Sequence, residues 1–321
     1  MHQLVRALIV IGALTCTGVS MAQPVPIRIG YGVAAEEQLW LMKALPSITP
    51  GQGKIYNLDM SAFRGTDQRF QAFEAGQLDL STGSGHSALF AMSQGMKGRI
   101  VASVSRETKK GFSTQYMVLD SSPIKTIADL KGKTVGNNAA RSSIELWARI
   151  AFQKAGLNPE RDVQWAVVPF PAQGDAVRSG KLDLGAFPQP FAANEKRKGG
   201  MRVLFTSKDA NPYDEELILL IAAEPFAQKQ PVALRAFLAD FVAATRYYLN
   251  NEKQAKQALL DAKLVLIPAE TFFAMDDYER DPNANVDLPG LEKMQDDQLK
   301  AGFQKTRIDV KSVIDSSFLP K

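Results

Sequence analysis

The sequence predicts an α/β protein made of two similar three-layer lobes with a cleft between them and a helical C-terminal tail. Short strand-like runs alternate with helical patterns from Ile27 onward, which is typical of mostly parallel sheets. A local motif recurs just over a hundred residues later in the chain. After Glu224 the pattern becomes almost entirely helical.

The elements follow from these patterns in order along the chain. Strands are expected at residues 27–29, 78–80, 100–104, 116–119, 163–168, 182–187, 203–205 and 217–222, and helices at 86–94, 231–249, 252–263 and 290–303. Pro231 suits the first turn of its helix, because that position needs no hydrogen-bond donor.

The recurring motif indicates two lobes of similar build. Residues 75–80 (AGQLDL) resemble residues 179–184 (SGKLDL). At nearly the same offset, Ile29-Gly30 with a helix carrying Trp40 resembles Val135-Gly136 with a helix carrying Trp147. Two matches at nearly the same offset favour a duplicated architecture.

Equivalent lobes would face each other across one cleft, because ligands of parallel sheets bind beyond the carboxyl ends of the strands. Segments 113–120 and 217–224 are the expected crossings between the lobes. We therefore predict lobe 1 at residues 23–115 plus 221–321 and lobe 2 at residues 116–220.

Residues 1–22 read as a secretory signal peptide. Arg6 precedes a short apolar stretch at 7–13, and small residues at 19–22 predict cleavage after Ala22. The apolar stretch is too short to span a bilayer. Cys16, the single cysteine, would be removed with the signal peptide. The alternative is a lipid anchor on Cys16, but the residues before it fit a lipobox poorly. We expect a periplasmic protein without disulfides or thiolate chemistry.

Composition narrows the class of function. The formal net charge is +4, with 38 Lys and Arg against 34 Asp and Glu. This mild excess does not favour nucleic acid, which needs a concentrated basic patch, but it is compatible with an anionic ligand. His86 is the one histidine beyond the signal, so neither a metal site nor a cofactor is expected.

The order of motifs resembles the periplasmic substrate-binding components of ABC importers in the sulfonate, taurine and nitrate group. The resemblance covers the expected mature chain, and its most specific segment is 122–136. Other motifs carry it as well: IRIGY at 27–31, GQLDL at 76–80, GKLD at 180–183 and DSSFL at 315–319. It implies a type II periplasmic-binding fold, hinge closure on a ligand and docking of a monomer on a permease.

Candidate ligand contacts in lobe 1 follow its strands. Tyr31 and Gly32 follow the first strand, and Arg64, with Gly65-Thr66, comes at the start of a further helix. The Gly- and Ser-rich segment 82–87 opens a helix, whose N–H groups favour an anion. Within it Ser84, Gly85 and His86 are candidates, and the resemblance places this loop in the cleft. The alternative is an ordinary turn with Ser84 as an N-cap and His86 in a surface or capping role.

In lobe 2 the equivalent loop offers Asn137, Asn138, Arg141 and Ser142. The guanidinium of Arg141 suits an oxyanion. The alternative is a cap formed by Ser142 with Glu145, leaving Arg141 in solvent.

Phe187 and Gln189 in the FPQPF segment complete the candidates. Phe187 and Phe191 offer apolar faces to a ligand, or they belong to the core. The resemblance places a carboxylate at Gln189, so recognition of an ammonium group is in doubt.

Glu36 and Glu37 would repel an anion from the first loop of lobe 1. They are expected to point outward, where they favour the helix dipole, unless the ligand carries a donor group.

The sequence therefore predicts a solute-binding protein that performs no covalent chemistry. Its expected ligand is a small organic anion, with an organosulfonate or an aromatic carboxylate first. A nitrate-like ion or a thiamine-pyrimidine precursor is a further option. The alternatives of another class are an enzyme or a sensor subunit on the same scaffold.

Overall fold

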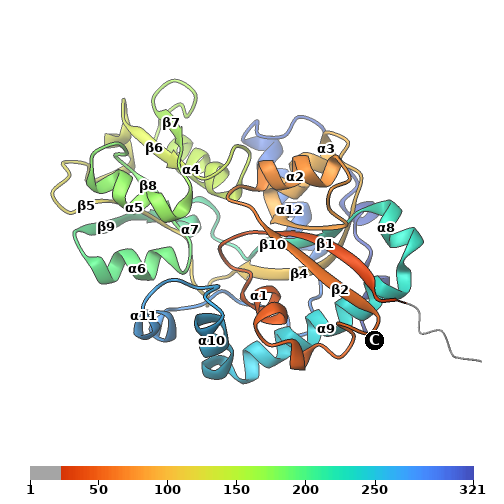
Figure 1. Cartoon of the computed structure of the whole chain (residues 1–321). Helices are drawn as coiled ribbons and strands as arrows, with labels where there is room; N and C mark the ends of the chain where they lie inside the picture. The colour runs from red at the N-terminus through yellow and green to blue at the C-terminus, as the bar shows by residue number, and fades with distance from the viewer. Residues whose placement is uncertain (1–22) are drawn as a thin grey trace, which may run out of the picture.

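The computed structural model describes residues 23–321. The predicted signal peptide, its cleavage site and Cys16 lie outside the described residues. Two α/β lobes, each built on its own sheet, lie side by side (Figure 1). The predicted fold class, with two three-layer lobes and a helical C-terminal part, is confirmed.

The sheet of the first lobe has the strand order β2-β1-β3-β10-β4. β1 pairs in parallel with β2 and β3, whereas β10 runs antiparallel between β3 and β4. The strands are β1 (Val25–Tyr31), β2 (Tyr56–Ala62), β3 (Leu80–Ser84), β4 (Arg99–Glu107) and β10 (Glu215–Ala222).

The second lobe repeats this arrangement. β6 pairs in parallel with β7, β5 runs antiparallel to β8 and β9, and a bridge between Val135 and Leu184 joins β6 to β8. The resulting order β7-β6-β8-β5-β9 matches the first lobe position for position. The strands are β5 (Gln115–Leu119), β6 (Thr134–Asn137), β7 (Gln164–Val167), β8 (Gly185–Phe187) and β9 (Met201–Thr206).

The alternation of side chains along β10 between the two faces of the sheet explains the three layers of the first lobe. Leu220 and Ala222 pack into one core, while Leu219 and Ile221 pack into a second core on the other face. Successive strand residues point to opposite faces, so a strand apolar at every position needs helices on both. Leu219, Leu220, Ile221 and Ala222 are all fully buried.

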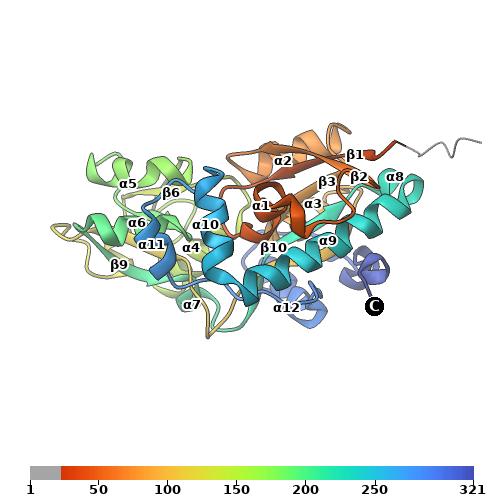
Figure 2. The same cartoon turned by 60° about the horizontal axis from the view of Figure 1, so that its bottom comes forward.

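The helices cover these faces. In the first lobe α1 (Glu37–Ala44) packs on α9 (Pro231–Asn250), and α3 (Gly85–Ser93) packs on α12 (Leu288–Lys300). Helix α11 (Ala269–Ala274) reaches α6 (Phe191–Lys198) of the second lobe (Figure 2). The remaining helices are α2 (Thr66–Glu74), α4 (Ser143–Lys154), α5 (Phe170–Arg178), α7 (Ser207–Ala210), α8 (Glu224–Lys229) and α10 (Glu252–Asp261), with 3-10 turns at Pro46–Ile48, Ile127–Leu130, Val310–Val313 and Ser316–Phe318.

The segment expected to be a Gly- and Ser-rich loop at 82–87 is ordered secondary structure instead. Strand β3 continues through Thr82 and Gly83 to Ser84, and α3 begins at once. Gly83 lies under the ring of Phe70, since an added Cβ would meet Phe70 Cζ at 2.3 Å. This glycine therefore serves packing between β3 and α2.

The predicted lobe boundaries at 115/116 and 220/221 stay a prediction. The first boundary falls within β5 and the second within β10. Each of these is the first strand that the chain adds to a lobe after it crosses from the other lobe. No helix in the described part of the chain is long and apolar enough to cross a membrane.

Candidate functional site

A cavity lies where the two lobes meet, beyond the carboxyl ends of their parallel strands. It offers about 60 Å³ to the centres of water-sized groups. The first turns of α2, α4 and α5 border it, as does Glu36, the N-cap of α1. Its walls are formed by Gly32, Val33, Ala34, Ala35, Glu36, Phe63, Arg64, Gly65, Thr66, Arg69, Ser84, Thr114, Asn138, Ser142, Ser143, Ile144, Phe170, Pro188, Leu217 and Ile218.

Arg69 is the buried cation of this cavity. It projects from α2, is 3% exposed, and places Nη1 3.7 Å from Glu36 Oε1 and Nη2 3.3 Å from Thr66 Oγ1. Nε finds no hydrogen-bond partner among residues 23–321. Burial lowers the pKa of Arg69, against the opposing effect of Glu36, but a guanidinium stays charged in proteins. Arg69 thus keeps donor capacity for an oxyanion.

Glu36 balances part of this charge and has partners of its own. Its carboxylate accepts from Gly32 N at 3.0 Å and from Thr82 Oγ1 at 2.8 Å. Burial raises the pKa of Glu36, an effect that Arg69 and these donors oppose. A side chain at position 32 would displace the Glu36 carboxylate, because an added Cβ on Gly32 would meet Glu36 Oε1 at 2.7 Å.

The second lobe supplies polar atoms from the opposite wall. Asn138 Oδ1 and Ser143 Oγ are buried and have no partner within the described chain. Ser142 is instead engaged, since its Oγ caps α4 by accepting from Glu145 N and donates to Asn137 Oδ1 at 3.1 Å. The N-terminal N–H groups of α4 and α2 carry partial positive charge toward the cavity.

Apolar side chains complete the enclosure. Phe63, Ile144, Phe170 and Leu217 line it from both lobes. A guanidinium and helix N-termini beside an apolar wall suit a small molecule with an anionic head and a short apolar body.

The lobes are closed on each other around this cavity. An added Cβ on Gly65 would lie 3.3 Å from Ala139 Cβ and 3.5 Å from Asn138 O. Ser87 Oγ donates to Arg141 O at 2.9 Å. The segments 82–87 and 137–142 therefore face each other, as the two-lobed scheme requires.

Five of the candidate ligand contacts line the cavity together. They are Gly32, Arg64, Ser84, Asn138 and Ser142. Arg64 is exposed, and Ser84 also caps α3 by accepting from Ser87 N at 3.2 Å.

The other lobe 1 candidates lie outside the lining. Tyr31 ends β1 inside the core, where burial raises its pKa. Gly85 packs on the backbone of β10, since an added Cβ would meet Glu216 O at 2.4 Å. His86 is fully buried, with Nε2 2.9 Å from Glu215 Oε1. The surface or capping alternative for His86 is therefore wrong, because α3 packs against β10 and takes the ring inside.

The remaining lobe 2 candidates also have partners elsewhere. Asn137 bonds Glu145 and Ser142, and the guanidinium of Arg141 lies over the rings of Phe90 and Phe303. The Ser142 cap that was the alternative prediction is present. The side chain of Arg141, however, packs on these two rings and is only partly in solvent.

Phe187 and Gln189 likewise turn away from the cavity. Phe187 is fully buried in the core of the second lobe, which agrees with the core alternative predicted from the sequence. Gln189 donates to Asp276 O at 2.9 Å in a separate groove, and Phe191 stacks on Phe170.

The expectation that Glu36 and Glu37 point outward is wrong, since both are fully buried. Each forms an ion pair with an arginine: Glu36 pairs with Arg69, and Glu37 Oε2 lies 2.5 Å from Arg280 Nη2. Burial raises the pKa of Glu37 to about 7, although Arg280 opposes the shift. Neither partner is near in sequence, so local pattern could not reveal the pairing.

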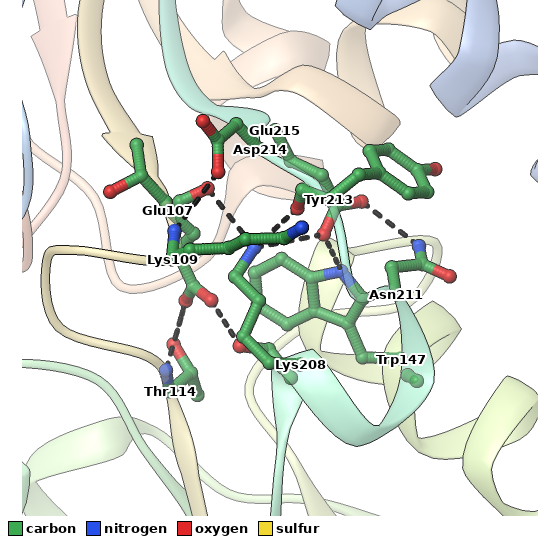
Figure 3. Close-up of polar contacts among 12 residues, drawn as sticks. Glu107, Lys109, Thr114, Trp147, Lys208, Asn211, Tyr213, Asp214 and Glu215 are labelled. Atoms are coloured by element: carbon green, nitrogen blue, oxygen red, sulfur yellow. Dashed lines mark hydrogen bonds and ion pairs between the residues drawn. The ribbon is translucent and has the colours of Figure 1, made fainter.

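A second polar cluster joins the two segments that cross between the lobes (Figure 3). Glu107, at the end of β4, accepts from Thr114 N at 3.1 Å and from Ser207 Oγ. Lys208 Nζ donates to Glu107 O at 3.0 Å and lies 3.8 Å from Glu215 Oε2.

Glu215 extends this cluster into both lobes. It accepts from Trp147 Nε1 and Asn211 Nδ2, each at 2.9 Å (Figure 3). It also pairs with His86. Burial raises the pKa of Glu107 to about 7, against the effect of Lys208 and of its hydrogen bonds. We call this cluster the polar hinge after its place at the two crossings between the lobes, and its Thr114 also lines the cavity.

Sequence reasoning missed Arg69, Ser143, Phe170 and Thr114. Phe170 could have been found, because it follows the strand predicted at 163–168 just as Arg64 follows β2. Arg69 lies within a helix, one turn after the cleft loop, where no local pattern separates it from a solvated arginine. Among the described residues, no group of three or more His, Cys, Asp or Glu side chains converges as a metal site.

A family model described as NMT1-like matches residues 22–261. The chain belongs to the NMT1-like family. A putative aliphatic sulfonates-binding protein of Escherichia coli K12 is 29% identical to this NMT1-like chain over 254 residues, covering 77% of this chain and 74% of that protein. The resemblance stated from the sequence is confirmed.

Solved structures share the fold. The periplasmic aliphatic sulphonate binding protein SsuA from Escherichia coli matches with a TM-score of 0.69 and 23% identity, covering 91% of this chain and 92% of that one. The alkanesulfonate-binding protein SsuA from Xanthomonas axonopodis pv. citri, bound to MOPS, matches with a TM-score of 0.73 and 17% identity, covering 92% and 99%. The desulfurization enzyme DSZB also shares the fold, with a TM-score of 0.62 and 12% identity, covering 92% and 97%. At these identities the likeness concerns the fold alone.

Proposed function

We propose that this NMT1-like protein is a monomeric periplasmic binding protein that captures a compact organic anion, a short alkanesulfonate, and delivers it to an ABC import permease. The observation that carries the proposal is the buried guanidinium of Arg69, which faces the cavity between the lobes with donor capacity to spare.

The polar groups of the cavity suit a sulfonate head. Its three oxygens can accept from Arg69, from the first N–H groups of α2 and α4, and from Ser143. The amide of Asn138 can turn its nitrogen toward an oxygen. Phe170 and Ile144 would cover the alkyl chain. Gly32, Arg64, Ser84 and Ser142 stay in the proposed site as lining residues.

The size of the cavity sharpens the choice among the anions expected from the sequence. The cavity is small, with about 60 Å³ open to the centres of water-sized groups. An ethanesulfonate fits that measure better than an aromatic carboxylate does. A nitrate-like ion would leave the apolar wall without a partner.

A thermal-shift and calorimetry panel tests this proposal. Ethanesulfonate at 100 times its Kd should stabilise the fold by about 2.7 kcal/mol, which raises Tm by roughly 4–5 °C. Taurine should bind more weakly than ethanesulfonate, because the Glu36 oxygens already accept two bonds from the protein. Benzoate, phthalate, nitrate and a thiamine-pyrimidine precursor should give smaller shifts.

Other outcomes identify the rivals. A shift with nitrate alone, or with the pyrimidine alone, would overturn the sulfonate. Conversion of a sulfonate to product by the purified protein would favour an enzyme, the class to which DSZB belongs. Binding without uptake by membrane vesicles that carry the permease would favour a sensor subunit.

Two neighbouring serines separate ligand binding from helix capping. Ser143→Ala removes a hydroxyl that has no partner within the described chain, so stability should hold while ethanesulfonate binds about tenfold more weakly. Ser142→Ala removes the α4 cap and should cost about 1 kcal/mol of stability. Urea unfolding and calorimetry on both variants measure these effects. Unchanged affinity in Ser143→Ala would take Ser143 out of the proposed site.

A further inference from the structure

The side chain of Arg141 reaches from the second lobe onto the first. Its guanidinium carbon lies 5.0 Å from the ring centre of Phe90 in α3 and 4.9 Å from that of Phe303, just after α12. Nη1 donates to Phe303 O at 3.0 Å. A cation that lies over two aromatic rings is attracted by both.

The backbone of Arg141 is held in an unusual conformation. Its φ is 59°, in the left-handed region that residues with a side chain rarely adopt. Two bonds hold it there: Arg141 N donates to Glu145 Oε2 at 2.7 Å, and Ser87 Oγ donates to Arg141 O at 2.9 Å. The first bond lies within the second lobe, and the second crosses to the first lobe.

Arg141 spans the lobes without lining the cavity. Within residues 23–321 the chain passes between the lobes in the segments between β4 and β5 and between β9 and β10, which carry the polar hinge. A rotation that opened the cleft would separate the loop of Arg141 from α3 and from Phe303. We propose that Arg141 is a closing latch, a positioning residue that stabilises the closed arrangement and thereby sets how long any ligand is held.

This proposal rests on the proposed function. It predicts a different result from the one expected if Arg141 contacted the ligand directly. The apparent affinity is the affinity of the closed form multiplied by the fraction of protein that is closed. Loss of the latch should therefore weaken every ligand by the same factor, and the change should appear in the dissociation rate.

Arg141→Asn is the variant to test, because asparagine tolerates the left-handed backbone and lacks the guanidinium. Arg141 is exposed, so the change leaves no buried void. We expect about tenfold weaker binding and a matching rise in koff, equal for ethanesulfonate and propanesulfonate. Phe90→Leu should weaken binding in the same way, and the double variant should lose less than the product of the two single losses. Arg161→Gln, at an exposed site of the same lobe, should change nothing.

A distance between the lobes tests the latch without relying on a ligand. Spin labels at Gln71→Cys in α2 and Asp175→Cys in α5 report lobe separation, and both sites are exposed. Arg141→Asn should lengthen the distance distribution in the ligand-free protein or at saturating ethanesulfonate. An unchanged distribution in both states, or an additive double variant, would overturn the latch. If no sulfonate binds, the ligand-free measurement still decides for or against it.

Discussion

Arg69→Gln should reduce ethanesulfonate binding by about 100- to 10,000-fold. Each hydrogen bond from a charged donor in a buried site contributes about 1.5–3 kcal/mol, and Arg69 can offer two to a sulfonate. Calorimetry on the purified variant measures the loss. Arg64→Gln, at the exposed rim of the same cavity, should cost no more than a few-fold, because solvent screens its charge.

The same change also leaves Glu36 buried without its ion partner. Removing one member of a buried pair costs about 3–5 kcal/mol, so Arg69→Gln alone should lower the unfolding midpoint as well. The double variant Arg69→Gln/Glu36→Gln separates the two effects. It should regain most of the stability and none of the affinity. Wild-type affinity in the double variant would refute the role of Arg69 as the anion anchor.

Protein stability should fall as pH rises from 5 to 8, in part because of Glu107 in the polar hinge. Its pKa is raised to about 7 by burial, whereas an unfolded glutamate titrates near 4.3. The folded state therefore holds this proton more tightly. The stabilising contribution is complete below the unfolded pKa and is lost as pH rises through the folded pKa.

Urea unfolding at pH 5 and pH 8 measures this effect. In Glu107→Gln the difference in stability between the two pH values should shrink by about 2 kcal/mol. Glu36, Glu37 and Glu216, whose pKa values are also raised by burial, account for the dependence that remains. Glu160→Gln, on the surface of the second lobe, should behave like wild type. An identical pH dependence in Glu107→Gln would mean that this carboxyl is ionised throughout.

Several site residues could be predicted from local sequence alone, and others could not. Gly32, Arg64, Asn138 and Ser142 follow parallel strands, and the carboxyl ends of such strands meet at one edge. Arg141 satisfies the same rule, yet its side chain turns onto Phe90 and Phe303, which lie far from it in sequence.

The sequence by itself determined the α/β class, the duplicated lobes and the edge at which their loops converge. These features depend on periodicity and on short motifs, which local residues encode. Only the tertiary structure decided which arginine faces the cavity, which glutamates are paired and which residues join the lobes. Those outcomes depend on partners brought together from distant segments, as Arg280 is brought to Glu37, and on burial that local pattern does not specify.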